Sequence, residues 1–259
     1  MTKDELRRMA LRMLADYDAR TPGELFSRPV DLTIPQSYKL QSASARLREE
    51  RGEKIIGYKV GCTSKPIREQ LGVREPIFGR IFDTGCFRSG ARLSYARYAN
   101  LAVEGELALR LSKDLAGPSP TEEECLGAIA AVFPVIELHH YVLHEARSPG
   151  PELIASNGMH AGFVLAEEPP RSGPSDLVHS LCIRINGVRV GAVEGSETVA
   201  SARESLRWLA GRLAGIGLGL GQGQIILTGS PLPLFPVKLG DKIVVEATSL
   251  GKSCADIGP

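Results

Sequence analysis

The sequence lacks several features that mark whole classes of protein. No apolar run approaches the ~20 residues that a membrane-spanning helix needs, so we expect no membrane partner. No run of lysine and arginine occurs, and the 31 basic and 30 acidic residues nearly cancel, which argues against a nucleic-acid partner. The five cysteines include no C-x-x-C pair, so neither a zinc site nor a disulfide framework is expected. Scattered thiols of this kind are typical of a reduced, cytoplasmic protein.

The first residues also lack the apolar core of an export signal. Their apolar positions recur at helical spacing instead, which predicts an amphipathic helix over residues 3–20. A second helix is predicted from about Pro35 to Arg51, because proline suits the first helical turn and Gly52 suits the end. We expect both helices to pack on the rest of the protein as a helical N-terminal portion, residues 1–65.

The remaining chain, residues 66–259 together with a strand just before it, is rich in strand patterns. Strands are predicted at 54–61, 103–111, 135–143, 161–166, 180–191, 224–229 and 241–247. Two helices interrupt them, at 121–133 and 201–215, and each opens with capping-box spacing, Thr121 with Glu124 and Ser201 with Glu204. This pattern predicts an α+β fold dominated by sheet, which can count as one domain with the helical portion.

Three connections have their own signals. Asn186-Gly187 predicts a hairpin turn, and residues 167–176 read as a surface loop. The glycine cluster GIGLGLGQG (215–223) is not a dinucleotide fingerprint, because a helix precedes it and a strand follows it, the reverse of what that motif requires. We expect a helix end and a flexible connection there.

Glutamates stand out in the strand VEGELALRL (103–111). Glu104 and Glu106 point to the same face, about 7 Å apart, since side chains alternate along a strand. Two acids this close repel each other unless a cation lies between them, and oxygen ligands suit Mg²⁺ or Mn²⁺. The alternative is an exposed face with two solvated acids. A third acid, Glu137 in the apolar strand PVIEL, needs a partner, either the same cation or an arginine.

An ordered set of motifs makes a family resemblance specific. GYKVGCTSKPIREQLGVREPIFGRIF (57–82), the E-x-E, the later Glu in PVIEL and GSPLPLFPVKLGD (229–241) occur in this order. GSE (195–197) stands ahead of the last long helix. The set resembles the 2-keto-4-pentenoate hydratase and 4-oxalocrotonate decarboxylase family, a branch of the fumarylacetoacetate hydrolase superfamily.

The resemblance implies a mixed β-roll/β-sandwich body, a Mg²⁺ or Mn²⁺ cofactor and 2-oxo-enoic acid substrates. It implies that Glu104, Glu106 and Glu137 are metal ligands and that Lys59 is the active-site lysine. A 2-oxo acid chelates a divalent cation, which stabilises the enolate formed on hydration or decarboxylation. Lys59 would hold the substrate charge or transfer a proton, unless it is an ordinary surface lysine.

Two departures from the family pattern bear on the reaction. Hydratases of the family usually have an aspartate where this chain has Ile77, whereas its decarboxylases have an apolar residue, so we lean slightly to decarboxylation. The family's E-I-V-D-S-R becomes ELHHYV (137–142), in which His140 and Val142 replace an acid and an arginine. By alternation His139 shares the face of Glu137 and is predicted as a catalytic base or extra ligand, or else as an ordinary hydrogen-bonded histidine.

A third departure affects the expected substrate contacts. The family's A-D-N-A-S-S becomes ASNGMH (155–160), with Ser156, Met159 and His160 as changes. The residues predicted to bind substrate are Ile77, Asn157, Met159, His160 and Ser230. These changes indicate either a different substrate specificity or a loss of activity.

Two other functions therefore stay as alternatives. An acylpyruvate-type C–C hydrolase is disfavoured because no histidine precedes the E-x-E. A diverged, non-catalytic partner subunit is disfavoured because an acid cluster without a use would only destabilise the fold. We expect a homo-oligomer, which could also include a related hydratase or decarboxylase subunit.

Overall fold

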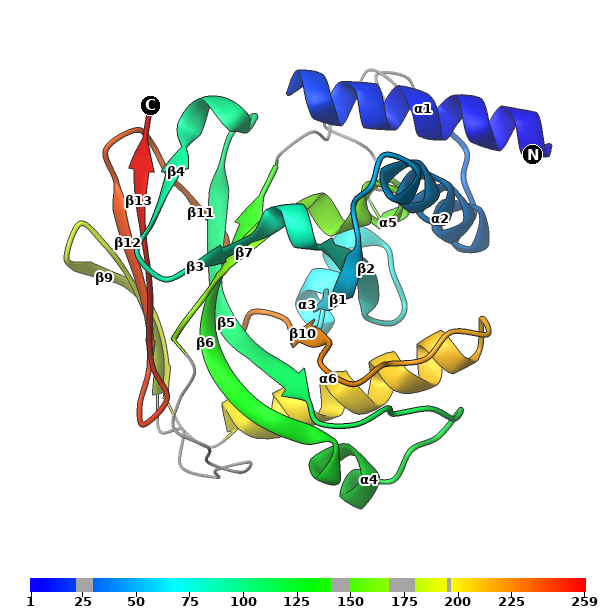
Figure 1. The fold of residues 1–259 in the computed structure, drawn as a ribbon. Coiled ribbons are helices and arrows are strands. Elements are labelled where there is room, and N and C mark those ends of the chain that lie inside the picture. The colour runs from blue at the N-terminus through cyan, green and yellow to red at the C-terminus, as the bar shows by residue number, and fades with distance from the viewer. Residues whose placement is uncertain (22–29, 141–149, 168–179, 195–196) are drawn as a thin grey trace.

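The computed structural model describes residues 1–21, 30–140, 150–167, 180–194 and 197–259. The predictions for Val142, for the loop after residue 167 and for residues 195–196 lie outside these ranges. Figure 1 shows three layers: a five-stranded sheet, a strongly curved eight-stranded sheet in the middle, and helices α1, α2 and α6 beyond it. The α+β architecture predicted from the sequence is confirmed.

The two N-terminal helices, α1 (Lys3–Ala19) and α2 (Ile34–Glu50), begin and end within one residue of their predicted bounds. Each opens with a threonine capping box, Thr2 with Glu5 and Thr33 with Gln36. They pack on each other, and α2 packs on α5 (Gly150–Ala155). The buried Gln41 of α2 joins them to the body, because its amide donates to the carbonyl oxygens of Phe78 (2.9 Å) and Ile154 (2.8 Å).

The eight-stranded sheet has the order β2-β1-β10-β5-β6-β7-β3, with β11 paired to β5. Strand β1 is parallel to β10, with Gly57 opposite Ile225, so a segment of the predicted N-terminal portion lies inside the sheet of the body. The division at residue 65 stays a prediction. The strands are β1 (Ile55–Gly61), β2 (Ile77–Phe82), β3 (Cys86–Arg88), β5 (Ala102–Leu111), β6 (Ile129–His139), β7 (His160–Leu165), β10 (Ile225–Leu227) and β11 (Phe235–Pro236).

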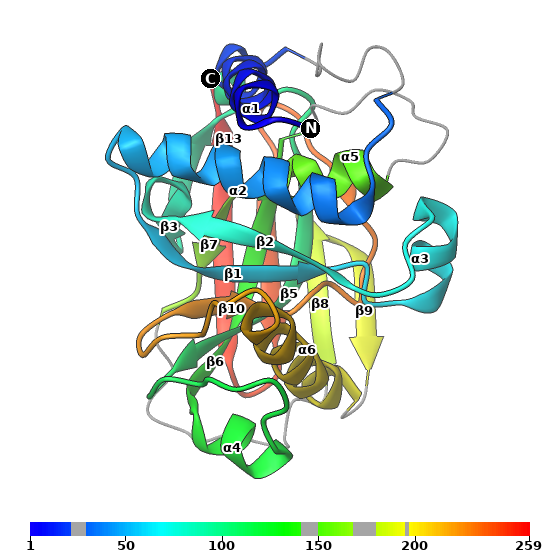
Figure 2. The ribbon, with the colours of Figure 1, turned by 90° about the vertical axis from the view of Figure 1, so that its right-hand side faces the viewer.

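This sheet rolls around its own side chains. Six buried residues from five strands pack together on one face, which is possible only if the sheet curves around them. In Figure 2, β1 and β2 accordingly cross in front of β5 and β6. The apolar part of the roll interior consists of Ile81, Ala108, Val135, Phe163, Ile225 and Leu227.

The second sheet covers the outer face of β5 and β6. Its order is β4-β13-β12-β8-β9, with β4 (Ala91–Ser94), β8 (Ser180–Ile185), β9 (Val188–Glu194), β12 (Lys242–Ala247) and β13 (Gly251–Gly258). Gly105 lies at the contact, where a Cβ atom would be 3.1 Å from Val245 Cγ2. Because Gly105 faces the second sheet, its neighbours Glu104 and Glu106 face the interior of the roll. The predicted hairpin turn is confirmed, with positive φ at Asn186 (53°) and Gly187 (80°).

Two helix predictions need correction. The helix predicted over 121–133 is only α4 (Glu122–Gly127), and the following apolar residues are the start of β6. The capping box at Thr121 is present, but Ser201 is not a helix cap, because α6 (Glu197–Ala214) begins four residues earlier. The glycine-rich segment after α6 leads into β10 as expected. The remaining short helices are α3 (Lys65–Leu71), η2 (Asp83–Gly85), η3 (Tyr95–Arg97) and η4 (Asn157–Met159).

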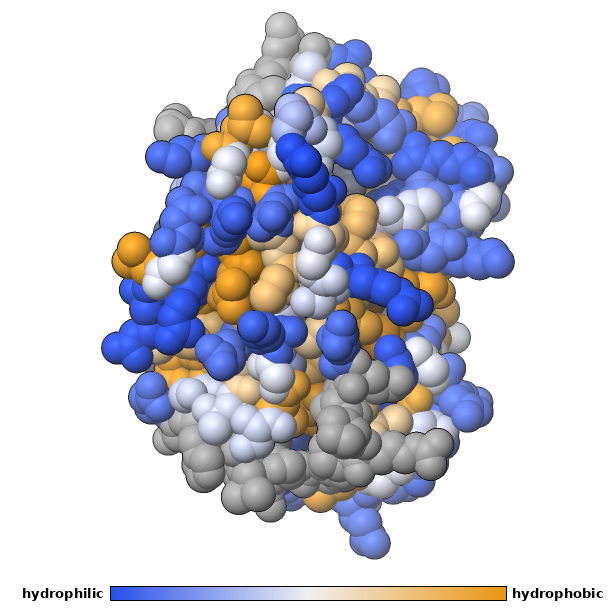
Figure 3. Space-filling view, turned by 60° about the vertical axis from the view of Figure 1, so that its left-hand side comes forward, coloured by the Kyte–Doolittle hydropathy of each residue, from blue (hydrophilic) through white to orange (hydrophobic). Residues whose placement is uncertain are grey.

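Within the described ranges, no helix is both long and apolar enough to cross a bilayer. On the side of the five-stranded sheet, orange and pale side chains form a central strip between blue, hydrophilic flanks (Figure 3).

A candidate metal centre inside the roll

The three glutamates predicted as ligands lie together in the interior of the roll. Glu104 and Glu106 are on β5, and Glu137 is on β6, directly opposite Glu104 in the antiparallel pair. Glu106 and Glu137 are completely buried, whereas the side chain of Glu104 keeps 22% of its surface exposed. The alternative of a solvated acidic face is therefore wrong.

Lys59 reaches this cluster from β1. Its Nζ lies 2.8 Å from Oε1 of Glu137, and the residue is only 4% exposed, so it is not a surface lysine. The predicted arginine partner of Glu137 is thus replaced by a lysine. Glycines make room for the side chain: a Cβ atom at Gly79 would lie 3.1 Å from Lys59 Cγ, and one at Gly158 would lie 3.5 Å from Lys59 Cε and Nζ.

Two histidines join the acids. His160, at the start of β7, places Nδ1 2.7 Å from Oε1 of Glu137, and its predicted contact with substrate stays a prediction. His139, at the end of β6, places Nε2 3.4 Å from Oε2 of Glu104 and 3.5 Å from Oε2 of Glu137. Both histidines are 3% exposed. His140 points away, as alternation predicts, and its ring lies between Tyr17 O and Ala99 N.

The charges in this cluster shift one another. Burial lowers the pKa of Lys59, but the charges of Glu137, Glu104 and Glu106 raise it to about 12. Burial raises the pKa of Glu106, and the neighbouring charge of Glu137 raises it further. Burial also raises the pKa of Glu137, yet the charges of Lys59 and His139 hold it well below its usual range. Glu137, beside the ammonium group of Lys59, is therefore ionised, whereas Glu106 resists ionisation.

Several polar atoms in the cluster have no hydrogen-bond partner among the described residues. They are Oε1 of Glu106, Oε2 of Glu137 and both ring nitrogens of His139. The other oxygen of Glu106 accepts the backbone N–H of Gly229, after β10. Leaving buried carboxylate oxygens unpaired is costly, and a divalent cation among them would remove that cost. The residues present therefore fit a metal ion, and one atom each from Glu104, Glu137 and His139 already lie within 4.8 Å of one another.

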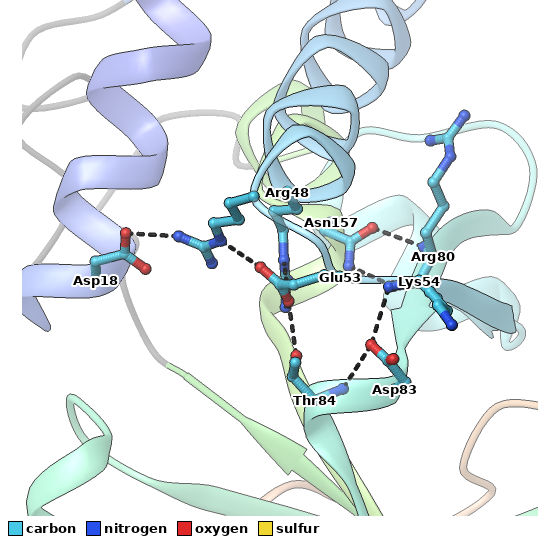
Figure 4. Close-up of polar contacts among 9 residues, drawn as sticks. Asp18, Arg48, Glu53, Lys54, Arg80, Asp83, Thr84 and Asn157 are labelled. Atoms are coloured by element: carbon cyan, nitrogen blue, oxygen red, sulfur yellow. Dashed lines mark hydrogen bonds and ion pairs between the residues drawn. The ribbon is translucent and has the colours of Figure 1, made fainter.

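Two residues predicted to bind substrate have polar groups already engaged with the backbone. The amide of Asn157 accepts from Arg80 N (2.7 Å) and donates to Arg80 O (2.8 Å), which ties η4 to β2 (Figure 4). The hydroxyl of Ser230 lies 2.9 Å from Gly105 O and accepts from Leu232 N (3.0 Å). Both residues therefore shape the site, and direct contact with a substrate stays a prediction for each.

The apolar members of that set lie beside Lys59. Ile77 is 2% exposed and shares the sheet face of Lys59, since it pairs with Gly61 while Gly79 pairs with Lys59. Met159 is half-buried and packs against the main core. It ends a run of three left-handed residues, with φ of 60° at Asn157, 66° at Gly158 and 59° at Met159. Strained backbone of this kind concentrates at functional sites.

The parts of the site that act through the lack of a side chain or through the backbone were not predicted from the sequence. Gly79 leaves the space that Lys59 Cγ and Asn157 O occupy, Gly158 has a left-handed φ of 66° beside Lys59, and Gly229 supplies the N–H that binds Glu106. Their signal was present in IFG, NGM and TGS, where glycine follows or interrupts an apolar strand end.

A network around Glu53 fixes the helices next to the site. Its carboxylate binds Arg48 (2.5 Å), Arg51 and Thr84 (2.6 Å), and Arg51 also binds Asp18 of α1 (2.8 Å; Figure 4). Burial raises the pKa of Glu53, but its hydrogen bonds to Arg48 and Thr84 lower it to about 2. The network joins α1, the C-terminal end of α2 and the segment before β1 to η2, which follows β2.

Comparisons with known proteins agree with this geometry. The family model of the fumarylacetoacetate (FAA) hydrolase C-terminal region matches residues 61–257. The chain is 32% identical to 2-hydroxyhexa-2,4-dienoate hydratase of Comamonas testosteroni over 236 residues, 90% of this chain and 89% of the relative. It is 29% identical to 2-keto-4-pentenoate hydratase of Paraburkholderia xenovorans over 85% of this chain and 82% of that one.

A solved structure covers nearly the whole molecule. The 4-oxalocrotonate decarboxylase of Pseudomonas putida, complexed with magnesium and adipate, superposes with a TM-score of 0.91 at 25% identity, over 99% of this chain and 98% of that one. The match includes both N-terminal helices and the roll that holds the acids. This chain belongs to the fumarylacetoacetate hydrolase C-terminal family, in its branch of 2-keto-4-pentenoate hydratases and 4-oxalocrotonate decarboxylases.

Proposed function

We propose that this protein is a divalent-metal-dependent lyase that acts on a 2-oxo-enoic or 2-hydroxydienoic acid. The observation that carries the proposal is the convergence of Glu104, Glu106, Glu137 and Lys59 inside the roll, with buried carboxylate oxygens that have no other described partner. The named relatives, hydratases of 2-hydroxydienoic or 2-keto-enoic acids and one decarboxylase, support the substrate class.

The carboxylates of Glu104, Glu106 and Glu137 would hold Mg²⁺ or Mn²⁺. The ion, when bound, would supply a Lewis acid for a 2-oxo acid, stabilising negative charge on the keto oxygen. Glu104, the only one of the three with an exposed edge, lies where the substrate's oxo-acid end would arrive.

Lys59 acts as a fixed positive charge. The surrounding carboxylates favour the protonated ammonium form, which donates a hydrogen bond to Glu137. Glu137 holds the ammonium group at 2.8 Å, in the space left beside Gly79 and Gly158. A pre-oriented donor of this kind stabilises charge that develops on an enolate oxygen.

Within the lyase reactions we favour decarboxylation. In that reaction the bond to the distal carboxylate breaks, and its electron pair moves through the conjugated chain to the keto oxygen as carbon dioxide leaves. No water has to be activated, and a buried apolar residue such as Ile77 beside Lys59 is compatible with this step. Hydration would need a group that delivers water and a proton, which Ile77 cannot do.

The test is product analysis by NMR with Mg²⁺ or Mn²⁺ present. A 2-oxo-enedioic acid should lose carbon dioxide, and a 2-hydroxydienoic acid should gain water slowly or not at all. Fast hydration without decarboxylation would agree with a lyase but would show that hydration, and not decarboxylation, is its reaction. No reaction with either compound would contradict the proposal.

A matched pair of variants ties the reaction to the acids. Glu106→Gln should abolish both metal binding and turnover, because a neutral amide replaces the carboxylate that would ionise to bind the cation. Glu246→Gln, which changes an exposed glutamate paired with Arg184, should leave both unchanged. A fully active Glu106→Gln protein would refute the ligand assignment.

The two alternatives have separate tests. Cleavage of an acylpyruvate into two acids would indicate a C–C hydrolase. A diverged partner subunit without activity would bind neither Mg²⁺ nor oxalate, so its melting temperature would not change with either.

We also propose that the protein is cytoplasmic and forms a homo-oligomer. A related hydratase or decarboxylase subunit is a second partner to be tested. The described cysteines are all free thiols, which supports a reducing compartment. Sedimentation velocity of the chain, alone and mixed with a related subunit, tests the assembly.

A further inference from the structure

His139 is a buried histidine without a hydrogen bond. It is 3% exposed, and among the described residues neither ring nitrogen has a hydrogen-bond partner. The other two described histidines differ in this respect. His160 binds Glu137 through Nδ1, and His140 uses one ring nitrogen for Ala99 N and the other for Tyr17 O.

The ring of His139 is aimed at the acids. It follows Glu137 by two residues on β6 and so lies on the same face of the strand. Nε2 lies 3.4 Å from Oε2 of Glu104 and 3.5 Å from Oε2 of Glu137. Two neighbouring ligands of an octahedral ion, each bonded at about 2.2 Å, are about 3.1 Å apart, so these separations need only small adjustments to become those of a shared ion.

Nε2 of His139 and Oε2 of Glu137 form only a long ion pair, at 3.5 Å, and neither atom has a hydrogen bond among the described residues. A cation between them would be a common partner for both atoms. Oε2 of Glu137 faces His139, whereas Oε1 is occupied by Lys59 and His160. The two sides of Glu137 thus have different surroundings: one side is fully paired, and the other is open toward Glu104 and His139.

We propose that His139 is a nitrogen ligand of the metal ion, together with Glu104 and Glu137, and that the site therefore prefers Mn²⁺ or another borderline transition ion over Mg²⁺. The inference rests on the proposed function only in taking the acid cluster as the metal site. Imidazole nitrogen is a good ligand for Mn²⁺, Fe²⁺, Co²⁺ and Zn²⁺, while Mg²⁺ favours oxygen ligands and retained water. Glu106, with one oxygen held by Gly229 N–H, supplies its remaining oxygen at the edge of this set.

Pulsed electron paramagnetic resonance of the Mn²⁺-loaded chain tests the ligand directly. The full-length protein is stripped with a chelator, loaded with Mn²⁺ and examined for hyperfine coupling to nitrogen. We expect ¹⁴N coupling that changes to ¹⁵N coupling when only the histidines carry ¹⁵N. This measurement on the wild-type chain needs no variant to fold, and the absence of histidine coupling would overturn the inference.

Variants then assign the signal to one residue. His139→Val should remove the nitrogen coupling and weaken Mn²⁺ binding by at least about tenfold, because loss of even an outer partner of a metal ligand has that effect. Mg²⁺ affinity, measured by calorimetry, should fall less. His160→Gln, which changes the histidine on the other side of Glu137, should keep the coupling. Coupling that survives His139→Val, or that disappears in His160→Gln instead, would contradict the assignment.

These readouts separate the inference from the proposed function. A chain that binds Mn²⁺ through His139 but converts no 2-oxo acid would refute the function and support the ligand. A chain that turns over 2-oxo acids, binds Mg²⁺ and Mn²⁺ equally well and shows no nitrogen coupling would support the function and refute His139 as a ligand.

Discussion

At the scale of single residues, Lys59 is the group whose surroundings leave it least freedom. It is 4% exposed, pairs with Glu137 and lies against Gly79, where a Cβ atom would be 3.1 Å from Lys59 Cγ. Replacing it with methionine keeps the length of the side chain and removes the charge. We expect Lys59→Met to lower kcat by about 100-fold or more, as removal of one preorganised donor typically does.

The same variant should keep its metal affinity, because Lys59 donates to Glu137 and is not itself a ligand. Steady-state rates and Mn²⁺ titration measure the two effects separately. Lys54→Met, which removes an exposed lysine five residues earlier, is the matched control and should change neither. Parallel loss of rate and metal affinity in Lys59→Met would instead give Lys59 a structural role.

Some residue contacts could be predicted from the sequence and others could not. Glu104, Glu106 and Glu137 were identifiable because acids in apolar strands need a partner. The contact of His160 with Glu137 was not, because it depends on an irregularity between β6 and β7. The pairing register shifts after Leu138, so His160 stands opposite His139. A one-residue irregularity of this kind leaves no pattern in the sequence.

At the scale of elements, the approach of η4 to β2 determines where Lys59 lies. A methyl group at Gly79 would be 2.7 Å from Asn157 O and 3.1 Å from Lys59 Cγ. Gly79→Ala should therefore push η4 and Lys59 apart, lower the free energy of unfolding by about 1–3 kcal/mol and reduce kcat. Gly215→Ala, where the nearest atom would be 3.5 Å away, is the control for thermal melting and rate. Normal kcat in Gly79→Ala would show that the contact is not needed for positioning.

The Glu53 network, between the N-terminal helices and β1, makes a pH-dependent contribution. The pKa of Glu53 is lowered to about 2 in the folded protein from its ordinary value of 4.5. Its stabilisation is therefore complete above pH 4.5 and is lost as the pH falls toward 2. Glu53→Gln should cost about 2 kcal/mol at pH 6 and clearly less at pH 3, since hydrogen bonds to a charged group contribute that much.

Urea denaturation of both proteins at the two pH values measures this difference. Glu246→Gln, at an exposed carboxylate, should show no such trend. A cost for Glu53→Gln that is the same at pH 6 and pH 3 would contradict the role of its charge.

Element boundaries show where sequence patterns are ambiguous. The run AIAAVF (128–133) suits a buried helix or a buried strand equally, and the partner strand β5 decides for β6. Ser201 and Glu204 have capping-box spacing, yet the helix begins at Glu197. Strands β2, β3, β4, β11 and β13 were not predicted, because short or glycine-containing strands lack clear alternation and depend on their neighbours. The long helices with strong caps were predicted within one residue.

At the scale of the whole molecule, the acid cluster makes stability depend on the metal. In the protein from which a chelator has removed the metal, the negative charges inside the roll repel one another and destabilise the folded state. An ion that binds only the folded state stabilises it. At about 100 times its Kd the ion should add about 2.7 kcal/mol, which raises the melting temperature by about 5 °C or more. Differential scanning fluorimetry with EDTA, Mg²⁺ and Mn²⁺ measures the shift. The Glu106→Gln protein should lose it, and an unchanged melting temperature in the wild type would contradict metal binding at this site.

The parallel pairing of β1 with β10 has a consequence for synthesis on the ribosome. Gly57 emerges long before Ile225, the residue that faces it across the sheet. Until β10 has been synthesised, β1, which carries Lys59, has an unpaired edge. Chaperones bind exposed segments of this kind. Translation must therefore be nearly finished before the roll can close around Lys59 and the three glutamates. A product that ends before β10 would be inactive and prone to aggregate.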